Sequence, residues 1–221
     1  MKSRAGNRRM QAYYAARAGE YDRIYLKPER QADLRKIQSW LQASLAEGSV
    51  LEIACGTGYW TQFYAPGCSR VVALDSAPET LGTARTRTPD TVNFIVGDAY
   101  RIPPQSEKFD AGFAGFWWSH IPLGRIQEFL HGFHDVLRSG AKVIFLDNRF
   151  VEGSSTPISE HDSEGNGYQA RRLDDGSIHR VLKNFPSREE LQQALSPHTD
   201  RVQYYEWEYY WAVEYSLVAP R

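Results

Sequence analysis

The chain is poor in cysteine, in long apolar runs and in net charge, and each shortage excludes a class of protein. Two cysteines in 221 residues, Cys55 and Cys68, do not make the disulfide framework of a small secreted protein. No run approaches the roughly 18 to 20 apolar residues that span a bilayer. The formal net charge is -1, so no basic field favours nucleic acid. We therefore expect a cytoplasmic protein with neither membrane nor nucleic acid as partner.

The N-terminal residues 1–10 are basic but lack the apolar core of a signal peptide, so we interpret them as a frayed tail. The length suits one well-buried domain. From about residue 30 to residue 150, helical patterns alternate with apolar runs that are typical of strands, at 50–53, 71–74, 92–96, 109–116 and 143–146. This alternation indicates βαβ units. The sequence predicts an α/β, doubly wound fold with a mostly parallel sheet.

Glycines and acids follow the first three of these runs. The stretch Val50–Gly58 ends in Cys-Gly-Thr-Gly, and glycines at a strand-to-helix turn let the backbone approach a ligand near free helix amides. Asp75 follows the second run, where α/β nucleotide-binding domains hold a ribose, and Asp98 follows the third, where it could accept a hydrogen bond from an adenine amino group. Because parallel strands end at one edge of a sheet, these positions predict one ligand site.

With these motifs the chain resembles the class I S-adenosylmethionine-dependent methyltransferases of the small-molecule type. The matching stretches are Val50–Gly58, Ala73–Asp75, Gly97–Ala99 and Phe109-Asp110, within residues 48 to 150. The resemblance implies a Rossmann-like methyltransferase fold with seven strands and the cofactor S-adenosyl-L-methionine, which leaves as S-adenosyl-L-homocysteine.

The resemblance also implies roles for single residues. Glu52 and the Gly56/Gly58 turn would contact the methionine part, Asp75 would hold the ribose, and Asp98 with the Ala99 backbone would face the adenine. The other cofactor-binding positions that it implies are Ala54, Trp60, Thr61, Ser76 and Phe116. Many relatives carry glycine where this chain has Ala54, a departure that we expect the fold to tolerate.

The segment before the first helix has alternating tyrosines and charges without a clean apolar face. In the methyltransferases that this chain resembles, such a segment folds over the cofactor as a lid, and the candidates here are Tyr14, Arg17, Tyr21 and Tyr25. Arg17 suits the methionine carboxylate because a guanidinium is a planar double donor. Ordinary half-buried packing of the tyrosines is an equal alternative.

We expect a single methyltransferase domain over residues 1–221. It would comprise a lid and first helix (1–47), a cofactor-binding core (48–150), a loop and hairpin insertion (151–186), and a closing helix and strands (187–221).

Several local signals place the elements of that domain. Pro28 starts the first helix, a second amphipathic helix runs from 126 to 137 and stops at Ser139-Gly140, and a hairpin turns at Asp174–Gly176. Ser187 and Glu190 form a capping box for a short helix ending at Leu195. The last two strands are expected at 204–211 and 212–218.

Catalytic residues are harder to predict, because methyl transfer from a sulfonium mainly needs alignment and exclusion of water. His120, in the loop after the fourth strand, is the candidate general base, with a structural helix-capping role as the alternative. Candidate acceptor-pocket residues are Trp117, Trp118, Asn148 and Arg149, with Lys183 and Asn184 as weaker ones. Of the two tryptophans, one in the core and one as pocket wall is the default.

We expect methyl transfer to a small molecule, aromatic or polar, by a monomer or homodimer. A protein or RNA methyltransferase is disfavoured because Phe116–Ser119 replaces an Asn/Asp-Pro-Pro-Tyr type motif. An NAD(P)-dependent oxidoreductase is less favoured still, because Thr61 stands where its fingerprint needs a third glycine. No metal is expected, since His131 and His134 lack a third ligand and Glu160-His161-Asp162 is interpreted as a solvated loop.

Overall fold

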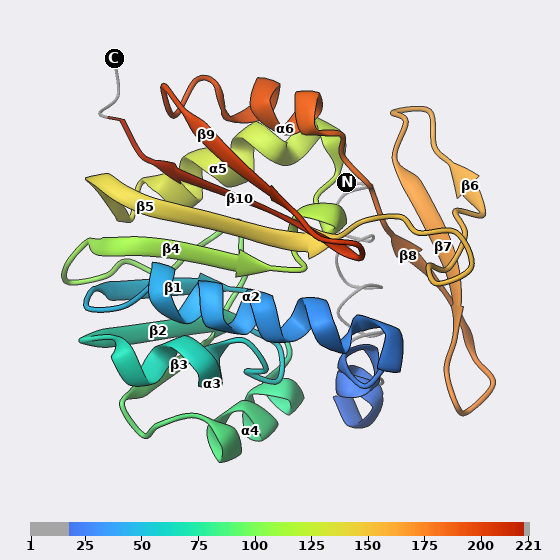
Figure 1. Cartoon of the computed structure of the whole chain (residues 1–221), viewed down its shortest axis with the longest axis horizontal. Helices are drawn as coiled ribbons and strands as arrows, with labels where there is room; N and C mark the ends of the chain where they lie inside the picture. Colours follow the sequence, from blue (N-terminus) through green and yellow to red (C-terminus); the bar gives the residue numbers. More distant parts are fainter. Residues whose placement is uncertain (1–17, 219–221) are drawn as a thin grey trace.

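The computed structural model describes residues 18–218, with side chains from Asp22 onward. Its main sheet has seven strands in the order β3-β2-β1-β4-β5-β10-β9 (Figure 1). Five strands are parallel: β1 (Ser49–Ile53), β2 (Arg70–Asp75), β3 (Val92–Val96), β4 (Phe109–Gly115) and β5 (Leu137–Asn148). Two are antiparallel: β10 (Tyr210–Ser216) pairs with β5, and β9 (Val202–Glu206) pairs with β10. The predicted seven-stranded, mostly parallel sheet is confirmed.

Helices cover both faces of this sheet. Successive side chains of a strand point to opposite faces, and those of β1 and β2 are buried on both. On one face α2 (Gln31–Ser44), α3 (Thr61–Tyr64) and α4 (Pro78–Arg87) share a core with Ile144 and Leu146 of β5. On the other face α5 (Ile126–His134) and α6 (Arg188–Leu195) pack against Val143 and Phe145 of the same strand. Each fully buried aliphatic or aromatic side chain stabilises the fold by about 1.5–3 kcal/mol.

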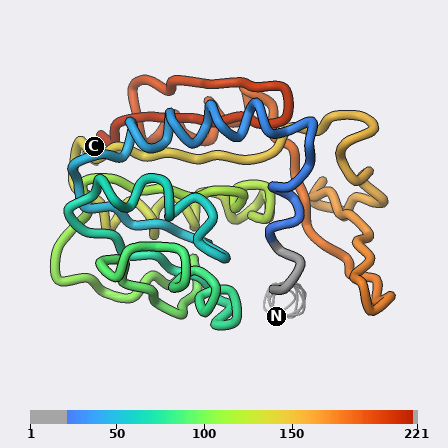
Figure 2. Tube along the Cα trace, turned by 60° about the horizontal axis from the view of Figure 1, so that its bottom comes forward, coloured from blue at the N-terminus to red at the C-terminus, as the bar shows by residue number. Residues whose placement is uncertain are grey.

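A second, three-stranded sheet stands beyond the carboxyl ends of the parallel strands (Figures 1 and 2). It comprises β6 (Glu160–His161), β7 (Gly167–Arg172) and β8 (Ile178–Leu182), and the predicted hairpin is its β7–β8 pair. Gly176 adopts φ 83° in the connecting turn, a left-handed conformation that glycine accepts without a steric cost. We call residues 151–186, which contain this sheet, the hairpin insertion.

Short 3-10 helices complete the chain: η1 (Ala18–Tyr25), η2 (Pro28–Arg30), η3 (Ala65–Gly67), η4 (Trp118–His120) and η5 (Leu123–Arg125). We call residues 18–30, which form η1 and η2, the lid segment. It lies beside the hairpin insertion at the same end of the sheet (Figure 2). Within residues 18–218, no helix combines the length and the apolar character needed to cross a membrane.

Three element boundaries differ from those predicted. Pro28 starts η2 instead of the α-helix, which begins at Gln31. Helix α5 ends at His134, and Leu137 already pairs with Phe109, so Gly140 (φ 79°) lies within β5, beside an irregular register with β4, rather than stopping a helix. The last two strands are joined by a turn at residues 207–209, closed by a hydrogen bond from Trp207 N to Tyr210 O. An aromatic run without glycine or proline gave no signal for that turn.

Candidate active site

The order of the parallel strands reverses between β1 and β4, and ligands of open α/β sheets bind in the crevice at such a switch point. The Gly56/Gly58 turn follows β1, Asp75 is the last residue of β2, and Asp98 follows β3. The structure thus places the predicted cofactor residues along one edge of the sheet.

The turn after β1 depends on left-handed backbone conformations. Gly56 and Gly58 adopt φ 55° and 72°. A Cβ on Gly58 would meet the Ala84 Cβ at 3.0 Å, so this glycine also lets α4 pack closely. Ala54 adopts φ 56°, which costs an L-residue roughly 1–2 kcal/mol relative to the right-handed form. The fold therefore carries strain at Ala54, where a glycine would adopt the same backbone conformation without that cost.

Asp75 at the end of β2 organises this turn. Its carboxylate accepts hydrogen bonds from Gly56 N (2.8 Å, on Oδ2) and Ala77 N (2.9 Å, on Oδ1). Burial raises the pKa of Asp75, and these amide donors counteract the rise. The Ser76 N–H and the Thr80 hydroxyl also counteract it, so this carboxylate faces donors from the start of α4 as well as from the glycine turn. Ser76, beside it, is exposed. The pair suits a ligand with two adjacent hydroxyls, such as a ribose.

Two further predicted positions lie on neighbouring connections. Asp98 is half-buried, and its Oδ1 accepts a hydrogen bond from Tyr100 N (3.0 Å), while Ala99 packs against the core. Phe116 follows β4 with φ 58°, and its N donates to Leu146 O (2.6 Å). Left-handed backbone at Ala54 and Phe116 thus follows both strands that flank the switch point.

Three predicted cofactor residues have side chains that are buried beneath the turn. Glu52 is 1% exposed, and its Oε2 accepts hydrogen bonds from Thr61 Oγ1 and Tyr64 Oη, both 2.6 Å. Burial raises the pKa of Glu52 to about 7. Trp60 is 4% exposed and Thr61 is not exposed. These side chains hold α3 against β1 and fix the turn from below, and their contact with a cofactor stays a prediction.

The lid segment is tied to the glycine turn. Asp22 accepts hydrogen bonds from Thr57 Oγ1 (2.6 Å) and Arg87 Nη2 (2.6 Å). Tyr25 is buried, and its ring stacks on Tyr59 with centroids 3.5 Å apart. Of the other predicted lid residues, Tyr14 and Arg17 lie outside the described residues, as does the side chain of Tyr21. Their contact with a cofactor stays a prediction.

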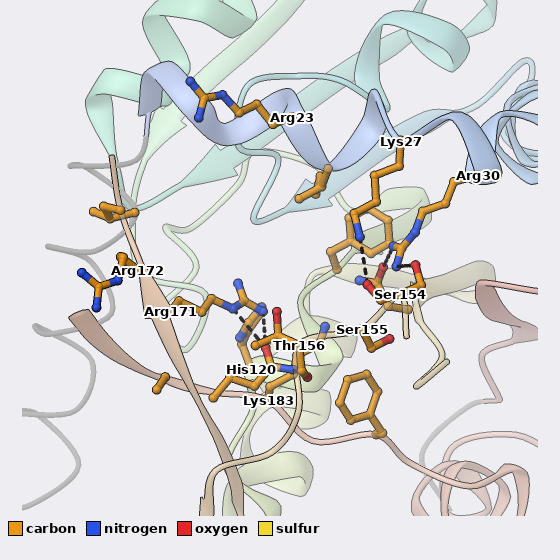
Figure 3. Close-up of a pocket in the computed structure, with 17 residues that line it drawn as sticks. Arg23, Lys27, Arg30, His120, Ser154, Ser155, Thr156, Arg171, Arg172 and Lys183 are labelled. Atoms are coloured by element: carbon orange, nitrogen blue, oxygen red, sulfur yellow. Dashed lines mark hydrogen bonds between the residues drawn. The ribbon is translucent and has the colours of Figure 1, made fainter. Parts of the chain in front are cut away.

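A cavity of about 480 Å³ opens beyond the ends of β4 and β5, between the lid segment and the hairpin insertion (Figure 3). We call it the basic pocket. Phe116, His120 and Asn148 line it, together with residues from the two flanking segments: Arg23, Ile24, Lys27, Arg30, Ser154, Ser155, Thr156, Gln169, Ala170, Arg171, Arg172, Leu173, Lys183 and Phe185. A volume of this size suits a small molecule.

His120 is 6% exposed in the wall of this pocket. Its Nδ1 lies 2.6 Å from the carbonyl oxygen of Leu182, which can only accept, so Nδ1 carries the hydrogen. Burial, together with the positive charges of Lys183 and Arg171, lowers the pKa of His120 to about 3. A group whose conjugate acid is this strong is a poor proton acceptor at neutral pH. The structure therefore places His120 where predicted but argues against the predicted role of general base.

Of the other predicted pocket residues, some line the basic pocket and others lie outside it. Asn148 lines the basic pocket and accepts a hydrogen bond from Arg30 Nη1 (3.0 Å). Trp118 is 2% exposed and packs on Phe145, and Trp117 is half-buried, so both lie outside the basic pocket. Arg149 donates to Trp207 O (2.7 Å), in the β9–β10 turn. Trp118 and Arg149 thus do not line this pocket, because the core and a neighbouring turn take their side chains, and their contact with an acceptor stays a prediction.

A buried ion pair joins the hairpin insertion to the main sheet. Lys183, 3% exposed, donates to Asp147 Oδ1 (2.9 Å) and to Ser119 Oγ (2.6 Å), and Asp147 at the end of β5 is not exposed. The Lys183 ammonium holds the pKa of Asp147 below its usual range, against the effect of burial. The sequence marked Lys183 only as a weak candidate and missed Arg30 and Arg171, since nothing local indicates that these distant residues meet. Within the described residues no metal-binding cluster occurs.

The residues at the switch point fit S-adenosylmethionine: a carboxylate for the ribose, a second one near the expected adenine, and a glycine turn that a backbone-contacting ligand can approach. Comparisons with known proteins agree. Residues 50–140 match a family model described as a methyltransferase domain. Over 77% of its length the chain is 26% identical to the malonyl-[acyl-carrier protein] O-methyltransferase of Hamiltonella defensa, and it spans 59% of that relative.

Two solved structures of DhpI are similar over almost the whole chain. The complex of DhpI with SAH (S-adenosylhomocysteine) has a TM-score of 0.79 at 29% identity and covers 97% of both chains. The complex with SAM (S-adenosylmethionine) and HEP has a TM-score of 0.78 at 29% identity, over 95% of this chain and 97% of DhpI.

Proposed function

Because the chain belongs to the class I S-adenosylmethionine-dependent methyltransferases, we propose that it transfers a methyl group to a small-molecule acceptor held in the basic pocket. The observation that carries this proposal is the position of the pocket at the ends of β4 and β5, directly beside the crevice between β1 and β4. Phe116 belongs to both, since it lines the pocket and its ring packs edge-on against Trp60 of the glycine turn (centroids 5.8 Å apart).

Within this proposal Asp75 holds the ribose, and Asp98 with the Ala99 backbone faces the adenine. The Gly56/Gly58 turn and Ala54 lie against the methionine part. Bound S-adenosylmethionine supplies a methyl group that its positively charged sulfur activates for displacement. The protein aligns the acceptor with the methyl group and keeps water out. This lowers the activation barrier of methyl transfer, because the two reactants are already oriented when the reaction begins.

A small acceptor is favoured over a macromolecule because the pocket is bounded on two sides, by the lid segment and by the hairpin insertion (Figure 3). Its polar wall, with the hydroxyls of Ser154, Ser155 and Thr156, favours a polar acceptor over a purely aromatic one. A cytoplasmic location and a monomer or homodimer stay predictions.

Calorimetric titration of the purified protein with S-adenosylmethionine, S-adenosylhomocysteine and NAD(H) tests the proposal. We expect one cofactor per chain for the first two ligands and no binding of NAD(H). Binding of NAD(H) alone would overturn the proposal and turn the search to redox substrates.

A further inference from the structure

The lid segment begins as a 3-10 helix, and this geometry decides which of its side chains face the glycine turn. Such a helix has three residues per turn, so residues i and i+3 lie on the same face. Asp22 and Tyr25 of η1 have this spacing. Asp22 accepts a hydrogen bond from Thr57, and Tyr25 stacks on Tyr59. One face of the lid segment is therefore seated on the turn that follows β1.

Arg87, the last residue of α4, completes a closed ring of polar contacts with this face. Its Nη2 forms an ion pair with Asp22 Oδ2 (2.6 Å), and its Nη1 donates to Thr57 Oγ1 (3.4 Å). The Thr57 hydroxyl donates in turn to Asp22 Oδ1 (2.6 Å). Both oxygens of the Asp22 carboxylate are thus held, one by a cation and one by a hydroxyl, and hydrogen bonds to ionised groups are the strong ones.

This ring is more sheltered from water than an ordinary surface ion pair. Thr57 is 1% exposed, and the side chains of Arg87 and Asp22 are 24% and 31% exposed. Another ion pair of the lid segment, between Arg23 and Asp174, is 61% exposed on both sides. Solvent and salt leave such an exposed pair with little net energy, whereas a sheltered pair keeps more of it. The Arg87 contact should therefore hold the lid segment more firmly than the Arg23 contact does.

Helix α4 gives Arg87 a fixed position beside the turn. At the beginning of this helix, Ala77 N donates to Asp75 Oδ1 (2.9 Å), which ties α4 to the end of β2. Near its end, Ala84 approaches the turn so closely that a Cβ on Gly58 would lie 3.0 Å from the Ala84 Cβ. Arg87 therefore extends from a helix that is anchored at both ends, whereas Asp22 belongs to a short 3-10 helix.

The lid segment also forms one wall of the basic pocket. Ile24, Lys27 and Arg30 line the pocket. Lys27 Nζ and Arg30 Nη2 donate to the carbonyl and the hydroxyl of Ser154 (2.8 and 3.0 Å; Figure 3). Because these residues follow Asp22 closely in the chain, a shift of η1 on the glycine turn would move them as well. A residue that fixes η1 thus acts on both the cofactor edge and the wall of the pocket.

We infer that Arg87 is a positioning residue: through Asp22 and Thr57 it holds the lid segment on the glycine turn and thereby slows the release of bound S-adenosylmethionine. This inference rests on the proposed function and adds a residue from outside the lining of the basic pocket. Arg87 needs no contact with the acceptor for this role. Its removal should loosen the lid segment and speed the release of the cofactor, while the glycine turn and Asp75 still bind it.

Hydrogen–deuterium exchange of the ligand-free protein measures how firmly the lid segment is held. We expect amides of residues 18–30 to exchange about fivefold faster in Arg87→Gln than in the wild type, with the strands of the main sheet unchanged. Arg87→Lys keeps the charge beside Asp22 and should restore slow exchange at least in part. Arg138→Gln, which breaks an ion pair with Asp110 at the opposite end of β4 and β5, is the matched control and should not alter the lid segment.

Calorimetry and stopped-flow measurements with S-adenosylhomocysteine test the consequence for the cofactor. Arg87→Gln and Asp22→Asn should each weaken binding about fivefold, and the change should lie in the dissociation rate. The double variant should bind within about twofold of either single variant, because both substitutions remove the same contact. The melting temperature of each variant shows whether the fold as a whole is intact.

The outcomes distinguish the two proposals. If Arg87→Gln leaves the exchange of residues 18–30 and the dissociation rate unchanged, the inference is wrong and the proposed function stands. Effects of Asp22→Asn and Arg87→Gln that add in the double variant, or a failure of Arg87→Lys to restore any of the loss, would also overturn the role of the ion pair. A general loss of stability in Arg87→Gln would make Arg87 a structural residue instead. If the wild type does not bind S-adenosylhomocysteine, the proposed function fails and the inference fails with it.

Discussion

Lys183 Nζ lies 2.9 Å from Asp147 Oδ1, and this buried contact joins the hairpin insertion to the end of β5. Ser119 completes it, because its N donates to the second Asp147 oxygen (2.9 Å) and its Oγ accepts from Lys183 (2.6 Å). The contact therefore fixes three segments that surround the basic pocket: β5, η4 and the chain directly after β8.

Lys183→Met should destabilise the protein by about 3–5 kcal/mol, because Asp147 would keep a buried charge without a partner. Denaturant unfolding followed by circular dichroism measures the effect. The double variant Asp147→Leu with Lys183→Met is the control and should recover much of the loss, since an apolar pair leaves no buried charge. A single variant within 1 kcal/mol of the wild type would contradict this account.

Asp75→Ala should weaken S-adenosylmethionine by about 10- to 100-fold or more, because hydrogen bonds to a charged group each contribute about 1.5–3 kcal/mol. Calorimetry measures the affinity. Asp75→Asn retains an oxygen for Gly56 N and should lose less. Glu79→Gln removes an exposed carboxylate of α4 outside the site and should bind normally. Normal affinity in Asp75→Ala would remove Asp75 from the cofactor site.

His120→Gln should lower turnover less than tenfold and leave both the cofactor affinity and the pH profile unchanged. The reason is that a histidine held neutral by burial contributes packing and a hydrogen bond to Leu182 O rather than proton transfer. Steady-state rates across pH, with KM and kcat separated, measure this. Loss of a titrating limb from the profile would restore His120 as general base.

Acid should destabilise the protein through His134, which is 7% exposed and bonded to Tyr215 Oη (2.6 Å). Burial, with the nearby His198 and His131, lowers the pKa of His134 from 6.5 to about 3. A depressed histidine pKa means that the unfolded chain takes up the proton first, so this stability is present above pH 6.5 and is lost as the pH falls toward 3.

The variant His134→Gln isolates that contribution. Between pH 6 and pH 5 the wild type should lose about 1 kcal/mol more unfolding free energy than the variant. His120 acts in the same direction and Glu52, with its raised pKa of about 7, in the opposite one, but both are common to the two proteins. Parallel stability curves for the two proteins in urea would contradict the buried, neutral state of His134.

The cofactor edge could be predicted from the sequence because its signals are local. Strand ends are marked by the apolar runs before Asp75 and Asp98 and by the glycines after β1. These signals do not depend on how the rest of the chain folds. The buried position of Glu52 could not be predicted, because it depends on how α3 brings Thr61 and Tyr64 over it.

The basic pocket could not be predicted for a different reason. Arg30 and Lys183 come from segments that are far apart in the chain, and their meeting depends on the packing of the lid segment and the hairpin insertion around β5. The left-handed backbone at Ala54 could not be predicted either, because alanine, unlike glycine, gives no signal of a positive φ.

The lid segment belongs to both ligand sites, since Asp22 binds Thr57 of the glycine turn and Arg30, eight residues further along the chain, lines the basic pocket. Conformational entropy that one ligand removes from this segment does not have to be removed again by the other. The two affinities are then linked, and each bound ligand should raise the affinity for the other ligand by the same factor. An empty protein would thus take up either substrate alone less readily than the pair.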